Sequence, residues 1–226
     1  MTEKRTFVAE VFDHLKSDGL IRGWEFVGSG ERHDYEVKML SGRTSIVETK
    51  GCLDGNNTNI FERPPQADEF IIWSLCQNPG SDPRHNAWSG IHTRLGAEVI
   101  HRRQRVDGLV IWDMVCGTPG RPCPKLQAGS RRTPISSTRG VPPPCLYLFP
   151  RSIPDARNNP SPPCWELGEL ELLHAFWTAF GGTPSDLVDV RIEVRIKGVN
   201  VQRRTHFFRQ EAEITSSKWT TIRRAR

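Results

Sequence analysis

The sequence contains no apolar run that approaches the roughly 20 residues a membrane-spanning helix needs. Its first residues, Met1 to Arg5, lack the apolar stretch of a signal peptide and include the acidic Glu3. None of the six cysteines forms a Cys-x-x-Cys pair, the spacing most typical of a structural zinc site. These absences argue against a secreted or membrane-spanning protein and predict a cytoplasmic protein with reduced thiols.

A second interpretation of the cysteines stays open, in which Cys116, Cys123, Cys145 and Cys164 are scattered zinc ligands rather than buried or incidental thiols. The chain has 226 residues, which favours one principal domain, and it can bury a core without disulfides. Its formal net charge is +5, from 31 Lys and Arg against 26 Asp and Glu. That balance permits a polyanionic partner without requiring one.

Apolar residues three or four apart predict helices, and alternating or continuous apolar runs predict strands. The expected helices span residues 7–15, 89–103 and 166–180. The expected strands span residues 24–27, 35–40, 44–50, 106–115, 145–149 and 188–197, the last turning at Gly198 into a partner strand through Phe207. Residues 70–73 fit either a strand or a buried helix. The predicted fold class is α/β, with a mixed central sheet flanked by helices.

Residues 118–164 differ in composition from the rest of the chain. They hold 12 of the 17 prolines and seven basic residues against one acid. Such a composition disfavours regular structure within a core. It predicts a basic, proline-rich insertion that contributes one strand, and a solvated loop or a partly disordered linker is the alternative.

The residues most informative about chemistry lie in the expected strands 35–40 and 44–50. Glu48 and Lys50 share a strand face, and a three-residue loop over 40–42 would set Asp34 opposite Glu48, with Cβ atoms about 4.5–5.5 Å apart. Two carboxylates at that separation repel each other unless a cation lies between them. Proteins commonly bind Mg²⁺ through one or two carboxylates, with water and phosphate as its other ligands. Lys50 could contact a water or phosphate oxygen beside the metal. Two acids, a lysine and a divalent metal suffice for phosphodiester hydrolysis.

This pattern resembles the PD-(D/E)xK nuclease superfamily, most closely its type II restriction endonucleases. The match is Asp34, followed after 13 residues by Glu48-Thr49-Lys50, in helix–strand–strand–strand order, and it covers residues 6 to about 115. The resemblance implies that both acids bind Mg²⁺ together with the Thr49 carbonyl, that Lys50 assists the attacking water, and that the substrate is double-stranded DNA. It also implies Glu10, in the first helix, as a possible accessory acid.

The sequence departs from the family name at one position, because His33 precedes Asp34 where the name has proline. The Glu-x-Lys form also recurs at residues 36–38 and on the charged face of residues 189–197. A solvated strand face with a surface ion pair is therefore the alternative for Glu48 and Lys50. An HNH-type nuclease, suggested by His85, His92 and His101, lacks the supporting cysteine pairs.

Asparagine amides can read adenine, and arginines contact guanine or phosphate. The candidate DNA-binding residues are Asn56, Asn57, Asn59 and Arg63 after the third strand, Arg102, Arg103 and Arg105 at the end of the second helix, and the pairs Arg131-Arg132, Arg203-Arg204 and Arg223-Arg224. The alternative for the asparagines is that they form turns. The alternative for the arginines at the helix end is that they interact favourably with the helix dipole.

On this interpretation residues 1–117 form the nuclease core and residues 118–164 the insertion, while residues 165–226 add a helix and a β-hairpin to the same domain for DNA gripping or dimerisation. The expected function is Mg²⁺-dependent, sequence-specific cleavage of double-stranded DNA. A homodimer is expected because a palindrome needs one active site per strand. The alternatives are a structure-specific repair or recombination nuclease, a non-enzymatic basic DNA-binding protein, and an interaction protein without a nucleic-acid partner.

Overall fold

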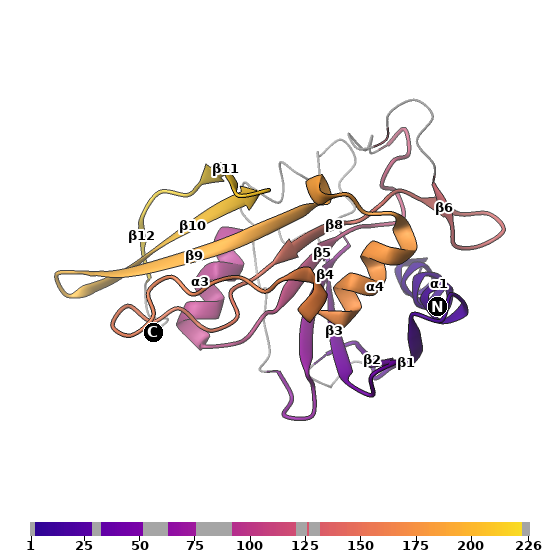
Figure 1. The fold of residues 1–226 in the computed structure, drawn as a ribbon, viewed down its shortest axis with the longest axis horizontal. Helices are drawn as coiled ribbons and strands as arrows, with labels where there is room; N and C mark the ends of the chain where they lie inside the picture. The colour runs from indigo at the N-terminus through magenta and orange to yellow at the C-terminus, as the bar shows by residue number, and fades with distance from the viewer. Residues whose placement is uncertain are drawn as a thin grey trace.

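The described residues form one mixed sheet of ten strands flanked by helices, and the α/β class predicted from the sequence is confirmed. The computed structural model describes residues 3–28, 33–51, 63–75, 92–120, 126 and 132–222. The strand order is β1-β2-β3-β4-β5-β8-β9-β10-β11, and β12 pairs with β10. Figure 1 shows α1 and the β9–β10 hairpin at opposite ends of an elongated molecule.

The described helices and strands have the following bounds. The helices are α1 (Glu3–Ser17), α3 (His92–Arg102) and α4 (Glu171–Phe180), with 3₁₀ turns η2 (Leu167–Glu169) and η3 (Pro184–Asp186). The strands are β1 (Ile21–Phe26), β2 (Tyr35–Met39), β3 (Thr44–Lys50), β4 (Glu69–Ser74), β5 (Gly108–Ile111), β6 (Thr133–Pro134), β7 (Gly140–Val141), β8 (Cys145–Leu148), β9 (Leu187–Lys197), β10 (Asn200–Arg209), β11 (Ala212–Ser216) and β12 (Thr220–Thr221). None of the described helices is both long and apolar enough to cross a bilayer.

The N-terminal half begins with the predicted helix and β-meander. α1 covers the expected range 7–15 and extends to Glu3, and its buried side chains recur every three or four residues. β1, β2 and β3 then pair in antiparallel fashion. β4 and β5 add to β3 in parallel, so residues 70–73 form a strand rather than a helix.

The middle strands are buried on both faces, which explains their near-continuous apolar sequences. The strand predicted over 106–115 is shorter, because the chain turns soon after β5. Asp113 fixes that turn: its carboxylate accepts the N–H of Val115 at 3.0 Å, and its carbonyl accepts the N–H of Cys116 at 3.2 Å.

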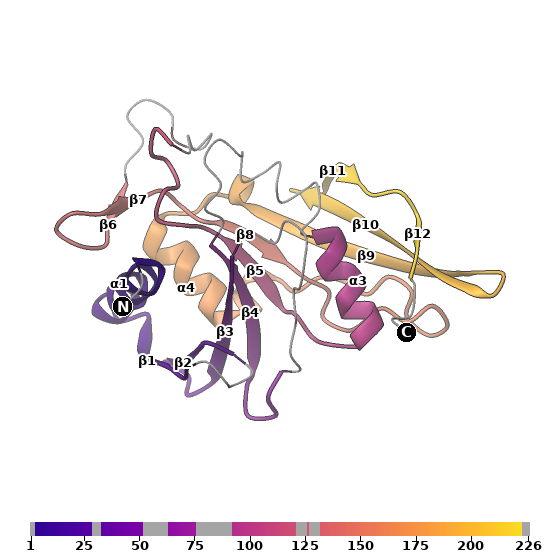
Figure 2. The ribbon, with the colours of Figure 1, turned by 180° about the vertical axis from the view of Figure 1, so that it is seen from behind.

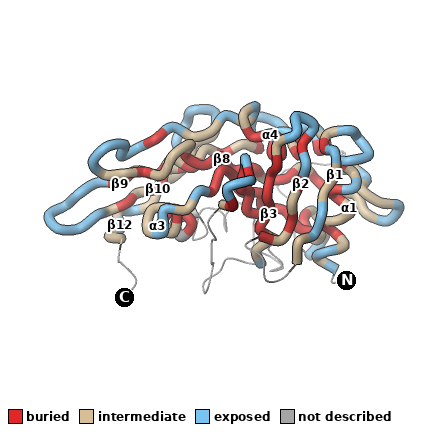
Figure 3. The backbone as a smooth tube through the Cα atoms, turned by 90° about the horizontal axis from the view of Figure 1, so that it is seen from below, coloured by how far each residue is buried: buried red, intermediate tan, exposed pale blue. Residues whose placement is uncertain are grey.

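Helices cover the sheet on both sides, as the two opposite views in Figures 1 and 2 show. α1 and α4 pack against odd-numbered side chains of β3 and β4, such as Val47 and Ile71. α3 packs against the even-numbered ones, such as Ile46 and Ile72. Figure 3 shows the buried positions concentrated along the central strands between these layers. Glu48 and Lys50 have even residue numbers, so their side chains lie on the face of the sheet that α3 covers.

An aromatic cluster joins α1 and α4 to the sheet. Trp73 and Trp112 stack with ring centroids 5.9 Å apart, and Phe7, Phe12 and Phe176 pack edge-on against Trp73. The Trp73 indole also donates to the Trp112 carbonyl at 2.8 Å. Each such side chain contributes roughly 1.5–3 kcal/mol by burial. The cluster fixes α1 firmly across the meander.

The proline-rich segment supplies more of the fold than its composition predicts. β8 lies in the central sheet between β5 and β9, which confirms a strand at 145–149. Pro144 immediately precedes β8 and Pro150 lies two residues after its end, so the four backbone N–H groups of β8 stay intact. β6 and β7 form a separate small hairpin. The prolines therefore delimit the regular structure here.

The C-terminal part contains the predicted helix and hairpin. α4 ends at Gly181 in the left-handed conformation, φ 69°, but begins at Glu171, five residues later than position 166. β9 and β10 pair from Asp189 with Phe208 to Lys197 with Asn200 and turn at Gly198, as predicted. β11 and β12 extend the sheet beyond this hairpin, and the sequence pattern gave no indication of either.

Candidate active site

The hairpin between β2 and β3 has the register predicted from the sequence. Tyr35 pairs with Val47, and Lys38 pairs with Thr44. A three-residue loop closes the hairpin with Gly42 at φ 94°, the left-handed conformation that such loops require. The paired residues end at Tyr35 and Val47, and the same register continued by one residue would set Asp34 opposite Glu48.

Asp34 is held firmly at the start of β2. Its Oδ2 accepts the backbone N–H of Thr49 at 2.7 Å and also the Thr49 hydroxyl. The Asp34 N–H donates to the carbonyl of Val47 at 3.1 Å. No hydrogen bond from the described part of the chain reaches the other carboxylate oxygen, Oδ1.

Glu48 is buried, at 8% exposure, and its Oε1 contacts the ammonium of Lys50. Burial raises the pKa of Glu48; the charge of Asp34 raises it further, and Lys50 opposes both effects. The two carboxylates therefore lie within electrostatic reach of each other. The contact between Glu48 and Lys50 agrees with the prediction that the two side chains share a face.

This donor set fits Mg²⁺. Asp34 Oδ1 and Glu48 Oε2 accept no hydrogen bond from the described residues. The N–H and C=O of one strand residue point to the same edge, so the Thr49 carbonyl faces the β2 side, as its N–H does. Within the described ranges, no three His, Cys, Asp or Glu side chains are grouped around a possible metal position. A metal here would depend on two carboxylates, a carbonyl, water and substrate, as Mg²⁺ commonly does.

Two basic residues of α1 approach the same strand ends, and the sequence interpretation missed them. The Lys4 ammonium lies 3.9 Å from where a Cβ on Gly51 would be. The Arg5 guanidinium stacks 4.3 Å above the Phe26 ring. Burial and then Asp34 raise the pKa of Tyr35 to about 12, and Arg5 opposes this rise. Cations in the first turn of a helix interact unfavourably with the helix dipole. The position of Lys4 and Arg5 in that turn was therefore the feature of the sequence that could have marked them as candidate functional residues.

The competing Glu-x-Lys pair, Glu36 and Lys38, belongs to a separate network. The Lys38 ammonium contacts Glu36 at 3.3 Å and the Thr44 hydroxyl at 3.0 Å, and its side chain is 48% exposed. His33, which is buried, lies 3.2 Å from the other oxygen of Glu36. Both Glu36 oxygens are therefore engaged, unlike those of Glu48.

Glu10 lies on α1, which covers the face of the sheet opposite Glu48. Its carboxylate pairs with the guanidinium of Arg139, from the proline-rich segment. No contact within the described residues joins Glu10 to Asp34 or Glu48. Its accessory role stays a prediction.

The candidate DNA-binding arginines occupy three kinds of environment. Arg63 is half-buried and donates to the Asp68 carbonyl at 2.6 Å and to Asp107 at 3.4 Å. Arg203 is buried, at 8% exposure. The remaining ones lie at or near the surface: Arg102 pairs with Glu98, Arg132 donates to the Gly117 carbonyl, Arg204 donates to Ser216 and Ser217, and Arg103 and Arg105 are exposed.

Several predicted residues lie outside the described residues. They are Asn56, Asn57, Asn59, Arg131, Arg223, Arg224 and His85, together with Cys123 of the possible zinc set. Cys116, Cys145 and Cys164 form no disulfide among the described residues, and burial raises the pKa of Cys164 to about 12.

Comparisons with protein-family models, curated proteins and solved structures find no match to this chain. The resemblance to PD-(D/E)xK nucleases therefore depends on the residues and their arrangement alone.

Proposed function

We propose that this protein is a Mg²⁺-dependent endonuclease that hydrolyses phosphodiester bonds in double-stranded DNA. The observation that carries the proposal is the register of β2 and β3, which brings Asp34, Glu48 and Lys50 to one strand end. Glu48 is buried beside a second carboxylate and has one cationic partner among the described residues, an arrangement that a divalent cation stabilises.

Each residue has a definite task in this proposal. Asp34, Glu48 and the Thr49 carbonyl hold the metal, and the hydrogen bonds from Thr49 orient the Asp34 carboxylate. When bound there, Mg²⁺ supplies polarisation of the phosphodiester and offsets charge on the leaving oxygen. The Lys50 ammonium places positive charge where negative charge develops in the transition state. Lys4 and Arg5 add positive charge at the same strand ends and favour approach of the DNA backbone.

Sequence-specific cleavage as a homodimer is the form of this activity that the residues favour. Candidate base-reading side chains follow directly after β3, and cutting both strands of a palindrome needs two copies of the site. A dimeric mass in the presence of target DNA is expected. A strictly monomeric mass with and without DNA would contradict the dimer but not the chemistry.

The decisive experiment is digestion of a long, fully sequenced DNA by wild type and by Lys50→Ala, each with Mg²⁺ or with EDTA. Wild type should give discrete fragments with Mg²⁺ only. Lys50→Ala should cleave about 10²–10³-fold more slowly, because one charged group is lost from the transition state. Its affinity for DNA in EDTA should change little.

Lys38→Ala is the matched control, since it removes the lysine of the competing Glu-x-Lys pair from the neighbouring strand. Cleavage by this variant should equal that of wild type. If Lys38→Ala is inactive and Lys50→Ala active, the register of the site is wrong. Intact DNA with wild type in Mg²⁺ favours a non-enzymatic DNA-binding protein, and cleavage confined to branched DNA favours a structure-specific nuclease.

A further inference from the structure

Arg203 is a buried cation that has no counter-charge among the described residues. It lies in the interior of β10, between Val194 of β9 and Thr220 of β12, and is 8% exposed. Its Nη1 is fully buried and has no hydrogen-bond partner, and no carboxylate of the described residues acts on its charge. Burial lowers the pKa of Arg203, yet a guanidinium stays charged in proteins. Buried charges are normally paired, so an anion that accepts hydrogen bonds from the guanidinium would stabilise it.

A second donor without a partner lies beside it. Thr205 is two residues further along β10 on the same face and is fully buried, and its hydroxyl has no hydrogen-bond partner among the described residues. α3 crosses directly above at Gly96, where a Cβ would be 3.3 Å from the Thr205 hydroxyl. Strand geometry places the two Cα atoms about 7 Å apart. The guanidinium and the hydroxyl thus form a small donor set enclosed between β10 and α3.

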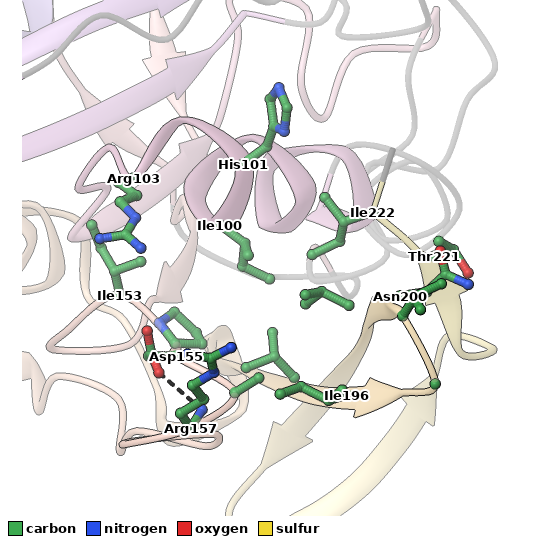
Figure 4. A pocket seen from close by; sticks show the side chains of 16 residues that line it. Ile100, His101, Arg103, Ile153, Asp155, Arg157, Ile196, Asn200, Thr221 and Ile222 are labelled. Atoms are coloured by element: carbon green, nitrogen blue, oxygen red, sulfur yellow. Dashed lines mark hydrogen bonds between the residues drawn. The ribbon is translucent and has the colours of Figure 1, made fainter. Parts of the chain in front are cut away.

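A groove opens next to this donor set. It has a volume of about 1180 Å³ and lies between the end of α3, residues 153–157 and the β9–β10 hairpin (Figure 4). Val194, which pairs with Arg203, lines it, as does Val201, two residues before Arg203 on the same face. Neither Arg203 nor Thr205 lines the groove itself, so a solute in the groove would reach the guanidinium only by passing these two neighbours.

The charges around the groove favour an anion. Arg103 and Arg157 line it together with His101. Asp155 is the acid among the described lining residues, and its Oδ1 already accepts the N–H groups of Arg157 and Asn158 at 2.9 and 3.0 Å. Figure 4 shows Arg103 and Arg157 on the same side of the groove as Asp155.

We infer that Arg203 and Thr205 bind a tetrahedral oxyanion of the phosphate class that enters through this groove. A phosphate group can accept two parallel hydrogen bonds from a guanidinium and a third from a hydroxyl. The site lies on β10, five positions along the sheet from β3, and is separate from Asp34 and Glu48. The phosphate comes either from a free phosphate ion or from a DNA backbone. Only the second source depends on the proposed function.

The first arm of the test uses inorganic phosphate at constant ionic strength, with chloride as reference. Phosphate should raise the melting temperature of wild type in a saturable way, by about 5 °C at one hundred times Kd. Arg203→Met should show no saturable rise, and in chloride it should be at least as stable as wild type, because an unpaired buried charge is removed. Arg195→Met is the matched control, since Arg195 lies on the opposite, exposed face of the paired strand. It should respond to phosphate as wild type does.

The second arm measures the affinity of the same proteins for duplex DNA in EDTA, which keeps binding apart from cleavage. If phosphate stabilises wild type and Arg203→Met binds DNA normally, the source is a free phosphate. If phosphate has no effect and Arg203→Met alone binds DNA at least 10-fold more weakly, the source is the DNA backbone. The proposal is overturned if phosphate leaves wild type unchanged and both variants bind DNA equally. It is also overturned if Arg203→Met responds to phosphate as wild type does.

Arg203→Lys covers the case in which the methionine variant does not fold. It keeps the charge and loses the forked donor geometry. It should show a clearly smaller phosphate-induced rise than wild type, and an equal rise would contradict the role of the guanidinium.

Discussion

The β2–β3 strand end and the junction of β4, β5 and α4 both bury carboxylates, but the two regions satisfy them differently. At the junction, Glu69 is 1% exposed and accepts the hydroxyl of Ser45 at 2.8 Å and the N–H groups of Glu171 and Leu172. It thereby caps the N-terminus of α4 from a neighbouring strand, where a negative charge is favourable.

Asp107 is a second buried carboxylate of this junction whose oxygens accept hydrogen bonds. It is 2% exposed and accepts the N–H of Phe70 at 2.8 Å and the indole N–H of Trp165 at 3.1 Å, with Arg63 at 3.4 Å. Glu48, in contrast, contacts Lys50 alone among the described residues and lies near a second carboxylate. The difference teaches that a buried acid with all acceptors used holds a fold together. A buried acid whose carboxylate oxygens are not all used as hydrogen-bond acceptors is suited to bind a metal ion and a substrate.

The largest expected effect tests the strand end directly. Glu48→Gln should reduce Mg²⁺-dependent cleavage by about 10²–10³-fold, because a metal ligand loses its charge. The free energy of unfolding should change little, since Glu48 makes one ion pair with its neighbour. Single-turnover cleavage and urea denaturation measure the two quantities. Glu36→Gln is the control, and a comparable loss of cleavage there would contradict the assignment.

The next effect concerns the junction. Asp107→Ala should lower the free energy of unfolding by about 3 kcal/mol, because two buried donors lose their acceptor and Arg63 loses its partner. Urea denaturation measures it. A loss below about 0.5 kcal/mol would show that Asp107 does not hold β4 and β5 together.

A smaller effect is a pH-dependent difference in the free energy of unfolding between wild type and Glu69→Gln. Burial raises the pKa of Glu69 above its usual value of 4.5, and the Ser45 hydroxyl and the backbone N–H groups of α4 oppose that rise. The folded state therefore holds this proton more tightly than the unfolded state. As pH rises above about 4.5, stability falls, by at most about 1.4 kcal/mol per pH unit.

Glu69→Gln lacks this titration, so wild type should lose stability relative to the variant as pH increases from 4.5 to 7.5. Guanidinium denaturation at intervals across that range measures the difference. A wild-type advantage that grows with pH would mean that the hydrogen bonds to Glu69 outweigh its burial.

The smallest expected effect is at the exposed pair. Lys38→Ala should change the free energy of unfolding by less than about 0.5 kcal/mol, since ion pairs of this exposure contribute little. Thermal unfolding measures it. A loss above 2 kcal/mol would show that the network of Glu36, Lys38 and Thr44 supports the β2–β3 hairpin.

Local features of the sequence predicted a large part of the fold. The meander, the β2–β3 register and the β9–β10 hairpin follow from alternation of side chains and from turn residues such as Gly42 and Gly198. The start of α4 was wrong by five residues because Glu69, a distant side chain, decides which N–H groups are capped. Lys4 and Arg5 were missed for the same reason, since only the packing of α1 brings them to the strand ends.

The sequence by itself indicated most of the strands and the register of β2 and β3, because a short loop and a two-residue period allow one register. Only the tertiary structure decided the surroundings of each charge. Asp107 and Glu69 find donors 37 and 103 residues away, whereas Arg203 is enclosed beneath α3 with no acid beside it among the described residues. Burial and partnership depend on which distant segments pack together, and no local pattern encodes that.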